Sequence, residues 1–386
     1  MMVPMQSNPA AATRLIVVAA VLVVLAAAIF LRHPISQALG RFKDAGIAAK
    51  ATSDVSATFG KHRLNVLILG YQDDEGLSDA VVLAHLDLDR PTITLVSVPR
   101  DTWVHIPGHG HNKINAAIGL GGPQLTAKVV SALTGAPIDA TMVVQPEGAK
   151  QLVDAIGGLN VNVEKDMDYD DNYGNLHIHL KKGEHYLTGG QVAGYIRFRH
   201  DPEGDYGRMR RQQQVARDLL HALGQPSNWS KLPRLITLAR SDVKTQLTDQ
   251  QLQALAELYR SVQPDDVRAL TLPSHTGSVG DASVVFVDDR WAKIIGRVLC
   301  APSAPSQDTV LVANATGDDD LIKTVIGALR GGGWNVQTFV TQRVADTTEV
   351  IGSSATANDL ARAMGPVKRG AGKDTVLRVG SDLLPN

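Results

Sequence analysis

The chain has 386 residues, which at about 150 residues per domain predicts two or three domains. Hydrophobic residues make up 44% of it and charged residues 20%, so the chain can bury sizeable cores and is not disordered as a whole. Its 38 Lys and Arg nearly balance its 39 Asp and Glu, and the net charge of −1 excludes a globally basic nucleic-acid binder. Cys300 is the single cysteine, which excludes an intrachain disulfide and a cysteine-based zinc site.

A run of seventeen uncharged residues lies near the N-terminus, from Leu15 to Leu31, between Arg14 and Arg32. A bilayer core of about 30 Å needs about 20 apolar residues, with about 17 as the lower limit. A cleaved signal peptide is the alternative, but its apolar region usually has only about 7–15 residues. The length therefore favours an uncleaved anchor, with residues 1–32 as cytoplasmic tail and transmembrane helix. Basic residues are sparser before the run than after it, and that count alone would place the rest of the chain in the cytoplasm.

Residues 33–62 are an Ala-rich spacer, and strands and helices alternate after it. Short β-branched runs bounded by turn residues predict strands at 65–71, 79–88, 92–98, 141–144, 268–272 and 283–287. Helical patterns occupy 113–119, 124–134, 146–156, 188–196, 207–223, 232–239, 248–262 and 289–299. This alternation predicts an α/β fold, an α/β/α sandwich with a central mixed sheet, over residues 63–299.

Residues 300–308 are a Pro- and Ser-containing linker. Beyond it, strands are predicted at 309–315, 333–340, 347–352 and 375–380, and helices at 319–330 and 355–364. Residues 309–386 are therefore expected to form a second, small α/β domain.

The segment 197–217, RFRHDPEGDYGRMRRQQQVAR, contains six arginines and no lysine. Arginine makes planar, bidentate contacts with phosphate, so the segment favours phosphate recognition. The alternative is a solvated helix face, which is the usual role of a charge run.

Helical geometry separates the arginines of this segment. At about 100° per residue, Arg208, Arg211 and Gln212 share a side with the apolar residues Val215, Leu219 and Ala222. The opposite, polar side carries Arg210, Gln214, Arg217 and His221. Charges rarely face a core unless they are neutralised there, so an anionic ligand or a carboxylate of the protein is expected at the first side.

Two further places could carry chemistry. Arg100 and Asp101 directly follow the strand 92–98, and ligand sites of open α/β sheets lie beyond the carboxyl ends of strands; a plain ion pair is the alternative. Between the first two strands, a loop collects four acids: Asp73, Asp74, Glu75 and Asp79. Such carboxylates suit Mg²⁺, although solvated loop acids are more common.

Other candidates are weaker. The segment 164–175 resembles a calcium loop, but its Gly and terminal Glu are misplaced, and an exposed polar excursion is expected instead. His177 and His179 alternate on one strand face, and without a third ligand they are interpreted as structural. Walker, dinucleotide-binding and nucleophile-elbow motifs are absent from the sequence.

Several segments occur together in a specific order: NVLILG, SD, SVPRDTWVHIPGHGHNKINAAIGLGGP, LVDAIGGLNVNV, GYIRFRH and DYGRMRRQQQ. In this order they closely resemble the LytR-CpsA-Psr family of cell-wall glycopolymer transferases, from about Leu64 to Leu223. Residues 309–386 are similar to the LytR C-terminal domain that often follows this core.

The resemblance implies an anchored enzyme with residues 33–386 outside the cytoplasm. Such an enzyme transfers a glycopolymer from a polyprenyl-diphosphate carrier to peptidoglycan with Mg²⁺, and nucleic acid is not a partner. The lipid would lie in an apolar groove between sheet and helices. A transcriptional regulator is disfavoured, because no basic helix-turn-helix face is visible.

The family motifs match this sequence residue by residue. Asp79, Arg100 and Asp205 are implied as catalytic, with Asp79 as metal ligand or base. Asp73 matches no motif position, and it is expected as a second metal ligand because it could replace the carboxylate lost at Gln72. The implied diphosphate-binding residues are Arg100, Arg197, Arg199, Arg208, Arg211 and Gln212.

Two positions depart from the family pattern. Gln72 replaces an Asp after the first strand, and Leu77 replaces an Arg before the Ser-Asp pair. These changes permit an alternative, a catalytically weak polyprenyl-phosphate binding protein. A second alternative is a pyrophosphatase, which the same site would be if water attacked instead of a sugar hydroxyl.

Overall fold

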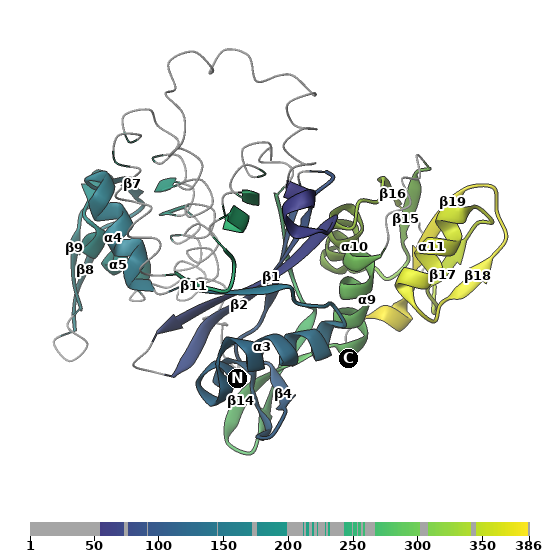
Figure 1. Cartoon of the computed structure of the whole chain (residues 1–386), viewed down its shortest axis with the longest axis horizontal. Coiled ribbons are helices and arrows are strands. Elements are labelled where there is room, and N and C mark those ends of the chain that lie inside the picture. Colours follow the sequence, from purple (N-terminus) through teal and green to yellow (C-terminus); the bar gives the residue numbers. More distant parts are fainter. Residues whose placement is uncertain are drawn as a thin grey trace, which may run out of the picture. The chain divides into compact units, whose positions relative to one another are not determined.

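The computed structural model describes most of the chain from residue 55 onwards (Figure 1). The described ranges are 55–72, 76–90, 92–144, 146–171, 176–198, 243–248, 267–301, 308–340 and 345–384, with single positions between 211 and 258. The run 15–31 lies outside them, and no helix of the described part is long and apolar enough to cross a membrane. The described residues form two compact units, of which the first contains 55–58, 68–81 and positions from 141 to 258, and the second contains 59–67, 82–140 and 267–384.

The central sheet has six strands in the order β11-β6-β1-β2-β3-β12. Their bounds are β1 Arg63–Gln72, β2 Leu77–Asp87, β3 Thr92–Val98, β6 Ala140–Val144, β11 Val243–Thr245 and β12 Val267–Thr271. β12 runs parallel to β3 and β11 antiparallel to β6, so the predicted mixed sheet is confirmed. Successive residues of β1 such as Val66, Leu67 and Ile68 are all buried, which explains why this strand reads as a continuous apolar run.

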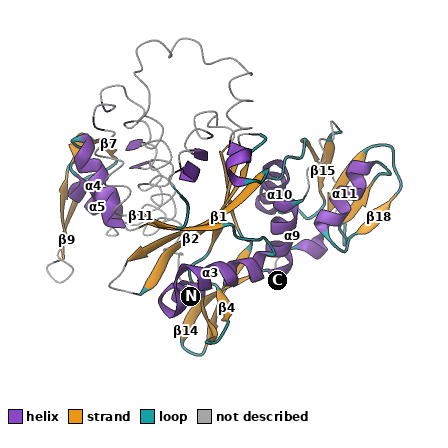
Figure 2. Cartoon of the chain, in the orientation of Figure 1, coloured by secondary structure: helices purple, strands orange, loops and turns teal. Residues whose placement is uncertain are grey.

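In the first unit, helices α4 (Pro146–Ile156) and α5 (Gly189–Arg197) lie beside two antiparallel strand pairs. β7 (Leu159–Val163) pairs antiparallel with β10 (Gly183–Leu187), and β8 (Met167–Asp171) pairs antiparallel with β9 (Leu176–Leu180) (Figure 2). Both helices were predicted, and of these four strands only the one that carries His177 and His179 was.

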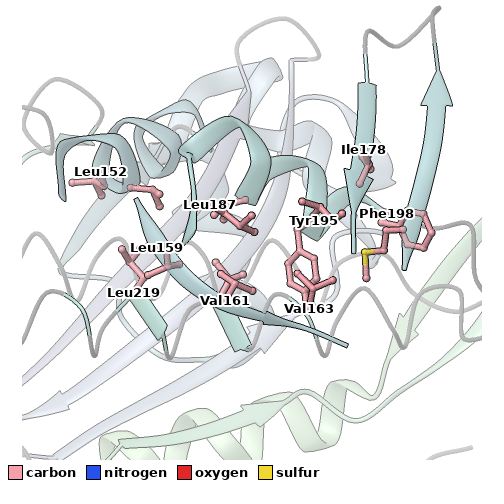
Figure 3. Close-up of a cluster of buried hydrophobic side chains, with 14 of the residues drawn as sticks. Leu152, Leu159, Val161, Val163, Ile178, Leu187, Tyr195, Phe198 and Leu219 are labelled. Atoms are coloured by element: carbon pink, nitrogen blue, oxygen red, sulfur yellow. The ribbon is translucent and has the colours of Figure 1, made fainter. Parts of the chain in front are cut away.

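Their inward side chains form one apolar cluster with the helices (Figure 3). Alternate residues of β7 are buried and exposed, so Leu159, Val161 and Val163 face this cluster. Thr188 begins α5 with a reciprocal capping interaction with Gln191, as its position before an apolar helix predicts.

In the second unit, the strand β3 is followed by a short hairpin and a long helix. The hairpin consists of β4 (Trp103–Ile106) and β5 (Gly110–Lys113), and helix α3 spans Ala117–Thr134 after a short 3-10 turn, Ile114–Ala116. Two separate helices were predicted here, and the observed helix is interrupted between them: Gly121 and Gly122 are non-helical, and Gly122 has a φ of 73° that favours glycine. A second hairpin, β13 (Ser274–Val279) and β14 (Ala282–Val287), leads to helix α9, Asp289–Cys300.

The C-terminal residues form a five-stranded sheet in the order β16-β15-β19-β17-β18. Its elements are β15 Val310–Asn314, α10 Asp319–Gly331, β16 Val336–Val340, β17 Glu349–Ile351, α11 Ala355–Met364, β18 Lys368–Gly370 and β19 Thr375–Val379. This part contacts α9: Arg297 donates hydrogen bonds to the carbonyls of Ala363 and Met364, and Trp291 Nε1 donates to Leu383 O at 2.5 Å. The predicted linker residues 302–307 lie outside the described part.

Candidate functional site

Of the nine predicted site residues, the structure describes the side chains of Arg100 and Arg211. Asp79 lies in β2 and Arg197 is the last residue of α5, but their side chains are not described. The other five lie outside the described residues: Asp73, Arg199, Asp205, Arg208 and Gln212. Arg100 belongs to the second unit and Arg211 to the first.

Arg100 lies just beyond the carboxyl end of β3, where the sequence predicts a ligand site. Thr102 closes the turn, because its backbone N–H and its hydroxyl both donate to Pro99 O, at 3.0 and 2.5 Å. The backbone N–H of Asn115 donates to Arg100 O at 3.1 Å. The turn therefore holds the Arg100 backbone from both sides.

The Asp101 carboxylate lies between two cations. Lys113 Nζ is 3.0 Å from Asp101 Oδ1, and Arg100 Nε is 3.7 Å from Asp101 Oδ2. Since 3.7 Å exceeds hydrogen-bonding distance, Asp101 makes its direct contact with Lys113 and acts on Arg100 at longer range. The side chain of Arg100 is 28% exposed, which keeps a positive charge at the end of β3 partly accessible.

Arg211 is completely buried, with an exposed fraction of 0%. Its Nη1 donates to Glu164 Oε1 at 2.9 Å and its Nη2 donates to Phe198 O at 2.6 Å. The guanidinium carbon also lies 5.5 Å from the centre of the Phe198 ring. The charge that the sequence predicts on the apolar side of this helix is therefore real, and a carboxylate of the protein neutralises it.

The described positions of this helix confirm its apolar side. Val215 and Leu219 are buried in the same cluster as Phe198, and Ala222 packs against it. Gln214 was predicted on the polar side of the helix, and the structure shows it half-buried. It accepts a hydrogen bond from Tyr195 Oη at 3.1 Å and donates one to Asn162 O at 2.9 Å. The long amide side chain reaches back to the neighbouring strand β7.

Glu164 is the residue that sequence reasoning missed. It belongs to the segment interpreted as an exposed polar excursion, and the structure instead forms strand β8 there. Met167 is buried and Tyr169 is half-buried, while Asp168 and Asp170, which alternate with them, are exposed. That alternation of apolar and acidic residues was the available strand signal.

On the exposed face of β8 and β9, each histidine pairs with an aspartate. His177 Nδ1 lies 2.5 Å from Asp170 Oδ1, and His179 Nδ1 lies 2.5 Å from Asp168 Oδ1. The contact with Asp168 raises the pKa of His179, and the contact with His177 lowers the pKa of Asp170. Within the described ranges, no group of three His, Cys, Asp or Glu side chains could hold a metal ion.

His85 is buried in the central sheet. Its Nδ1 is 2.8 Å from Asn65 Oδ1, and Asn65 Nδ2 donates to Pro137 O at 2.7 Å and to Cys300 Sγ at 3.3 Å. Burial lowers the pKa of His85 to about 3 and raises the pKa of Cys300. His85 therefore stays neutral near pH 7 and is a structural residue.

The mixed sheet, with Arg100 directly after its strand β3, makes this an α/β protein with a candidate anion-binding site at the end of a strand. Comparison of the sequence with family models identifies the family. The model of the LytR_cpsA_psr family matches residues 34–294, so the chain belongs to that family. A second model, described as LytR cell envelope-related transcriptional attenuator, matches residues 307–383.

Characterised relatives share about half of the chain. It is 35% identical over 216 residues to the regulatory protein MsrR of Staphylococcus aureus, which covers 55% of this chain and 64% of that protein. It is 31% identical over 228 residues to the polyisoprenyl-teichoic acid–peptidoglycan teichoic acid transferase TagV of Bacillus subtilis. That match covers 56% of this chain and 58% of TagV. Each match thus spans less than two thirds of the relative.

The fold is also that of a solved structure, protein gbs0355 from Streptococcus agalactiae. The TM-score is 0.50 with 21% sequence identity, and the match covers 62% of this chain and 86% of the other. At that identity, the likeness supports the fold alone.

Proposed function

We propose that this protein transfers a glycopolymer from a polyprenyl-diphosphate carrier to peptidoglycan. The observation that carries the proposal is Arg100, a partly exposed cation fixed beyond the end of β3 within the segment that matches the family. TagV, whose name states a teichoic acid transfer to peptidoglycan, supports the same reaction class.

In the proposed reaction, a hydroxyl oxygen of peptidoglycan attacks the phosphorus that bears the glycopolymer. The new P–O bond forms as the bond to the bridging diphosphate oxygen breaks, and polyprenyl phosphate leaves with the electron pair. The hydroxyl proton passes to Asp79 or Asp205. The task of the protein is to stabilise the phosphoryl oxygens, for which arginines are suited.

The proposed diphosphate ligands are Arg100, Arg197, Arg199, Arg208 and Gln212. Arg211, which the sequence also predicts as a ligand, is completely buried and paired with Glu164, so we assign it a positioning role instead: its Nη2 donates a hydrogen bond to Phe198 O, the residue between Arg197 and Arg199. It therefore positions the two arginines that flank Phe198.

Mg²⁺ is part of the proposal, with Asp79 and Asp73 as its ligands. Carboxylate oxygens at the ends of strands are suitable donors for this ion, and Asp79 lies in β2. When bound, the ion would neutralise charge on the phosphoryl oxygens.

We further propose that residues 15–31 anchor the protein in the membrane and that residues 33–386 lie outside the cytoplasm. The proposed domain division is a spacer at 33–62, an α/β/α catalytic core at 63–299, a linker at 300–308 and a small α/β domain at 309–386. The uncharged length of the run and the family membership support this arrangement. A phosphatase fused after residue 62 should be active only outside the cytoplasm; activity inside would reject the topology.

The function is tested with full-length protein, a short polyprenyl-diphosphate glycan and uncross-linked peptidoglycan. Transfer yields polyprenyl phosphate and a glycan bound to peptidoglycan in equal amounts. Release of polyprenyl phosphate without acceptor identifies a pyrophosphatase, and binding without turnover identifies a lipid-phosphate binding protein. Arg100→Ala and Arg208→Ala should each weaken donor binding about tenfold or more, whereas Arg210→Ala, on the predicted polar side, should change it little.

A further inference from the structure

The outer face of the β4–β5 hairpin carries three aromatic rings. The strands pair antiparallel, with Trp103 opposite Lys113 and His105 opposite His111. Because alternate residues of a strand share a face, these four side chains lie on one side of the hairpin, whereas Ile106 is buried on the other. Trp103, His105 and His111 are called the ring face below.

The rings of the ring face contact one another. The His111 ring stacks with Trp103, with centroids 6.4 Å apart and planes at 22°, and meets His105 edge-on at 5.3 Å and 75°. His105 and His111 are exposed and Trp103 is half-buried. Within the described part of the chain, no group hydrogen-bonds the ring nitrogens of His105 or His111. The ring face thus combines an apolar surface with accessible polar ring atoms.

The ring face is connected to the turn that carries Arg100. Lys113, which pairs with Trp103 across the hairpin, forms the 3.0 Å ion pair with Asp101, next to Arg100. The N–H of Ile114 donates to Thr102 O and the N–H of Asn115 donates to Arg100 O, so both ends of the hairpin are tied to the same turn. The hairpin that carries the rings is therefore anchored at its base to the turn that holds Arg100.

The chemistry of these rings suits a sugar. A pyranose has an apolar C–H face, which packs on an aromatic ring, and a rim of hydroxyls, which hydrogen-bond to imidazole nitrogens. A metal site does not fit, because the described residues contain no suitable group of three ligands. The reaction also needs an acceptor hydroxyl beside the phosphorus bound at Arg100.

We propose that the ring face binds a sugar of the peptidoglycan acceptor strand. This inference rests on the proposed function and assigns its second substrate to a surface. Trp103 provides the stacking surface, and His105 and His111 hold the sugar hydroxyls.

The test uses the full-length protein in detergent. Binding of soluble, uncross-linked glycan strands is measured by calorimetry, and the acceptor KM is measured in the transfer assay. Trp103→Ala should raise the glycan dissociation constant and the acceptor KM about tenfold, and Trp103→Phe should raise them no more than about threefold. His111→Ala should raise them by a factor between these two. Binding of the polyprenyl-diphosphate donor should change less than about twofold in all three variants.

Tyr186→Ala is the matched control, because Tyr186 is an aromatic residue of a strand and is 66% exposed. Equal glycan affinity for Trp103→Ala and Tyr186→Ala overturns the assignment, as does a Trp103→Ala variant that loses only binding to anionic vesicles. If Trp103→Ala does not fold, Trp103→Phe and His111→Ala decide the question. Wild-type protein that binds glycan strands through Trp103 but transfers nothing supports the ring face and rejects the proposed function.

Discussion

Arg211 donates a 2.6 Å hydrogen bond to the carbonyl of Phe198, the residue that separates Arg197 from Arg199. The same guanidinium is neutralised by Glu164, on a segment 47 residues earlier in the sequence. A buried pair therefore holds the carbonyl of Phe198, which lies in the sequence between two proposed phosphate ligands.

Breaking this pair should destabilise the protein strongly. Glu164→Gln leaves the buried Arg211 charge without its carboxylate and Arg211→Met leaves Glu164 alone, so each should lower the free energy of unfolding by about 3–5 kcal/mol, with Glu164→Gln at the lower end. Denaturant titration of both variants and of the double variant measures this, and the double variant should recover part of the loss. Arg362→Ala is the control, since Arg362 is 79% exposed and its ion pair with Asp359 should contribute at most about 1 kcal/mol. Equal losses at Arg362 and Arg211 would contradict the burial argument.

Asp79 should be the carboxylate most important for activity. Asp79→Asn keeps the shape of the side chain and removes its charge, so it should abolish transfer while the fold and lipid binding remain. Asp73→Asn should raise the Mg²⁺ concentration for half-maximal rate if Asp73 replaces the carboxylate absent at Gln72. Titration of Mg²⁺ against transfer rate for wild type and both variants checks this. Wild-type turnover that is indifferent to a chelator would reject the metal.

The C-terminal part should stabilise the core without taking part in the chemistry. A Cβ added at Gly331 would lie 2.3 Å from Thr94 Oγ1 and 2.9 Å from Leu299, so Gly331→Ala should cost about 1–3 kcal/mol through overpacking. Gly190→Ala is the control, because its Cβ would meet only Thr188 Oγ1 at 4.0 Å and alanine favours helix α5, by up to about 1 kcal/mol.

Removing residues 302–386 gives the complementary test. The truncated chain should keep its transfer rate and lose thermal stability, since Trp291 and Arg297 of α9 lose their carbonyl acceptors. Calorimetry and the transfer assay measure the two effects separately. A truncated chain with unchanged stability but no activity would show that the C-terminal part takes part in the reaction and does not stabilise the core.

His85 should make stability depend on pH below neutrality. Its pKa is about 3 in the folded protein against 6.5 in the unfolded chain, so protons bind the unfolded state first. The stability is fully present above pH 6.5 and falls as the pH drops from 6.5 towards 3, by up to about 1.4 kcal/mol per pH unit. His179 acts in the opposite direction: its raised pKa stabilises the fold below pH 6.5, and that effect disappears as the pH rises past its folded value. Urea titrations at pH 5 and pH 7.5 should show a steep difference for wild type and a smaller one for His85→Gln; an equal difference would exclude His85 as its source.

Much of the fold could be predicted because its signals are local. Strand Thr92–Val98 and helices Pro146–Ile156 and Ala355–Met364 have the predicted bounds, since a β-branched run, a proline at the helix start and a serine cap each act within a few residues. Strands β7, β8 and β10 were missed, and in β7 and β8 the exposed faces carry amide and acidic residues, which obscured the apolar alternation. The hairpin β4–β5 was missed because Lys113 was assigned to the following helix.

Of the candidate site, too, only the part with local signals could be predicted from the sequence. Burial of Arg211 followed from helical spacing, but the identity of its partner did not, because a sequence indicates that a buried charge needs a counter-charge without saying which residue supplies it. The roles of Asp79, Asp205 and the remaining arginines come from the family resemblance, and they stay predictions.

Helix α9 touches two neighbours with different faces: Gly296 lies against the end of α3, where an added Cβ would come 2.0 Å from Thr134 O, and Trp291 and Arg297 meet the C-terminal part. A gene rearrangement that cut the chain after α9 would expose the buried indole of Trp291 and the guanidinium of Arg297 to water. Since water solvates the guanidinium, a descendant of such an event would gain mainly from a polar or smaller residue in place of Trp291. The residue at position 291 of a related sequence should therefore indicate whether a C-terminal part like this one packs against its α9.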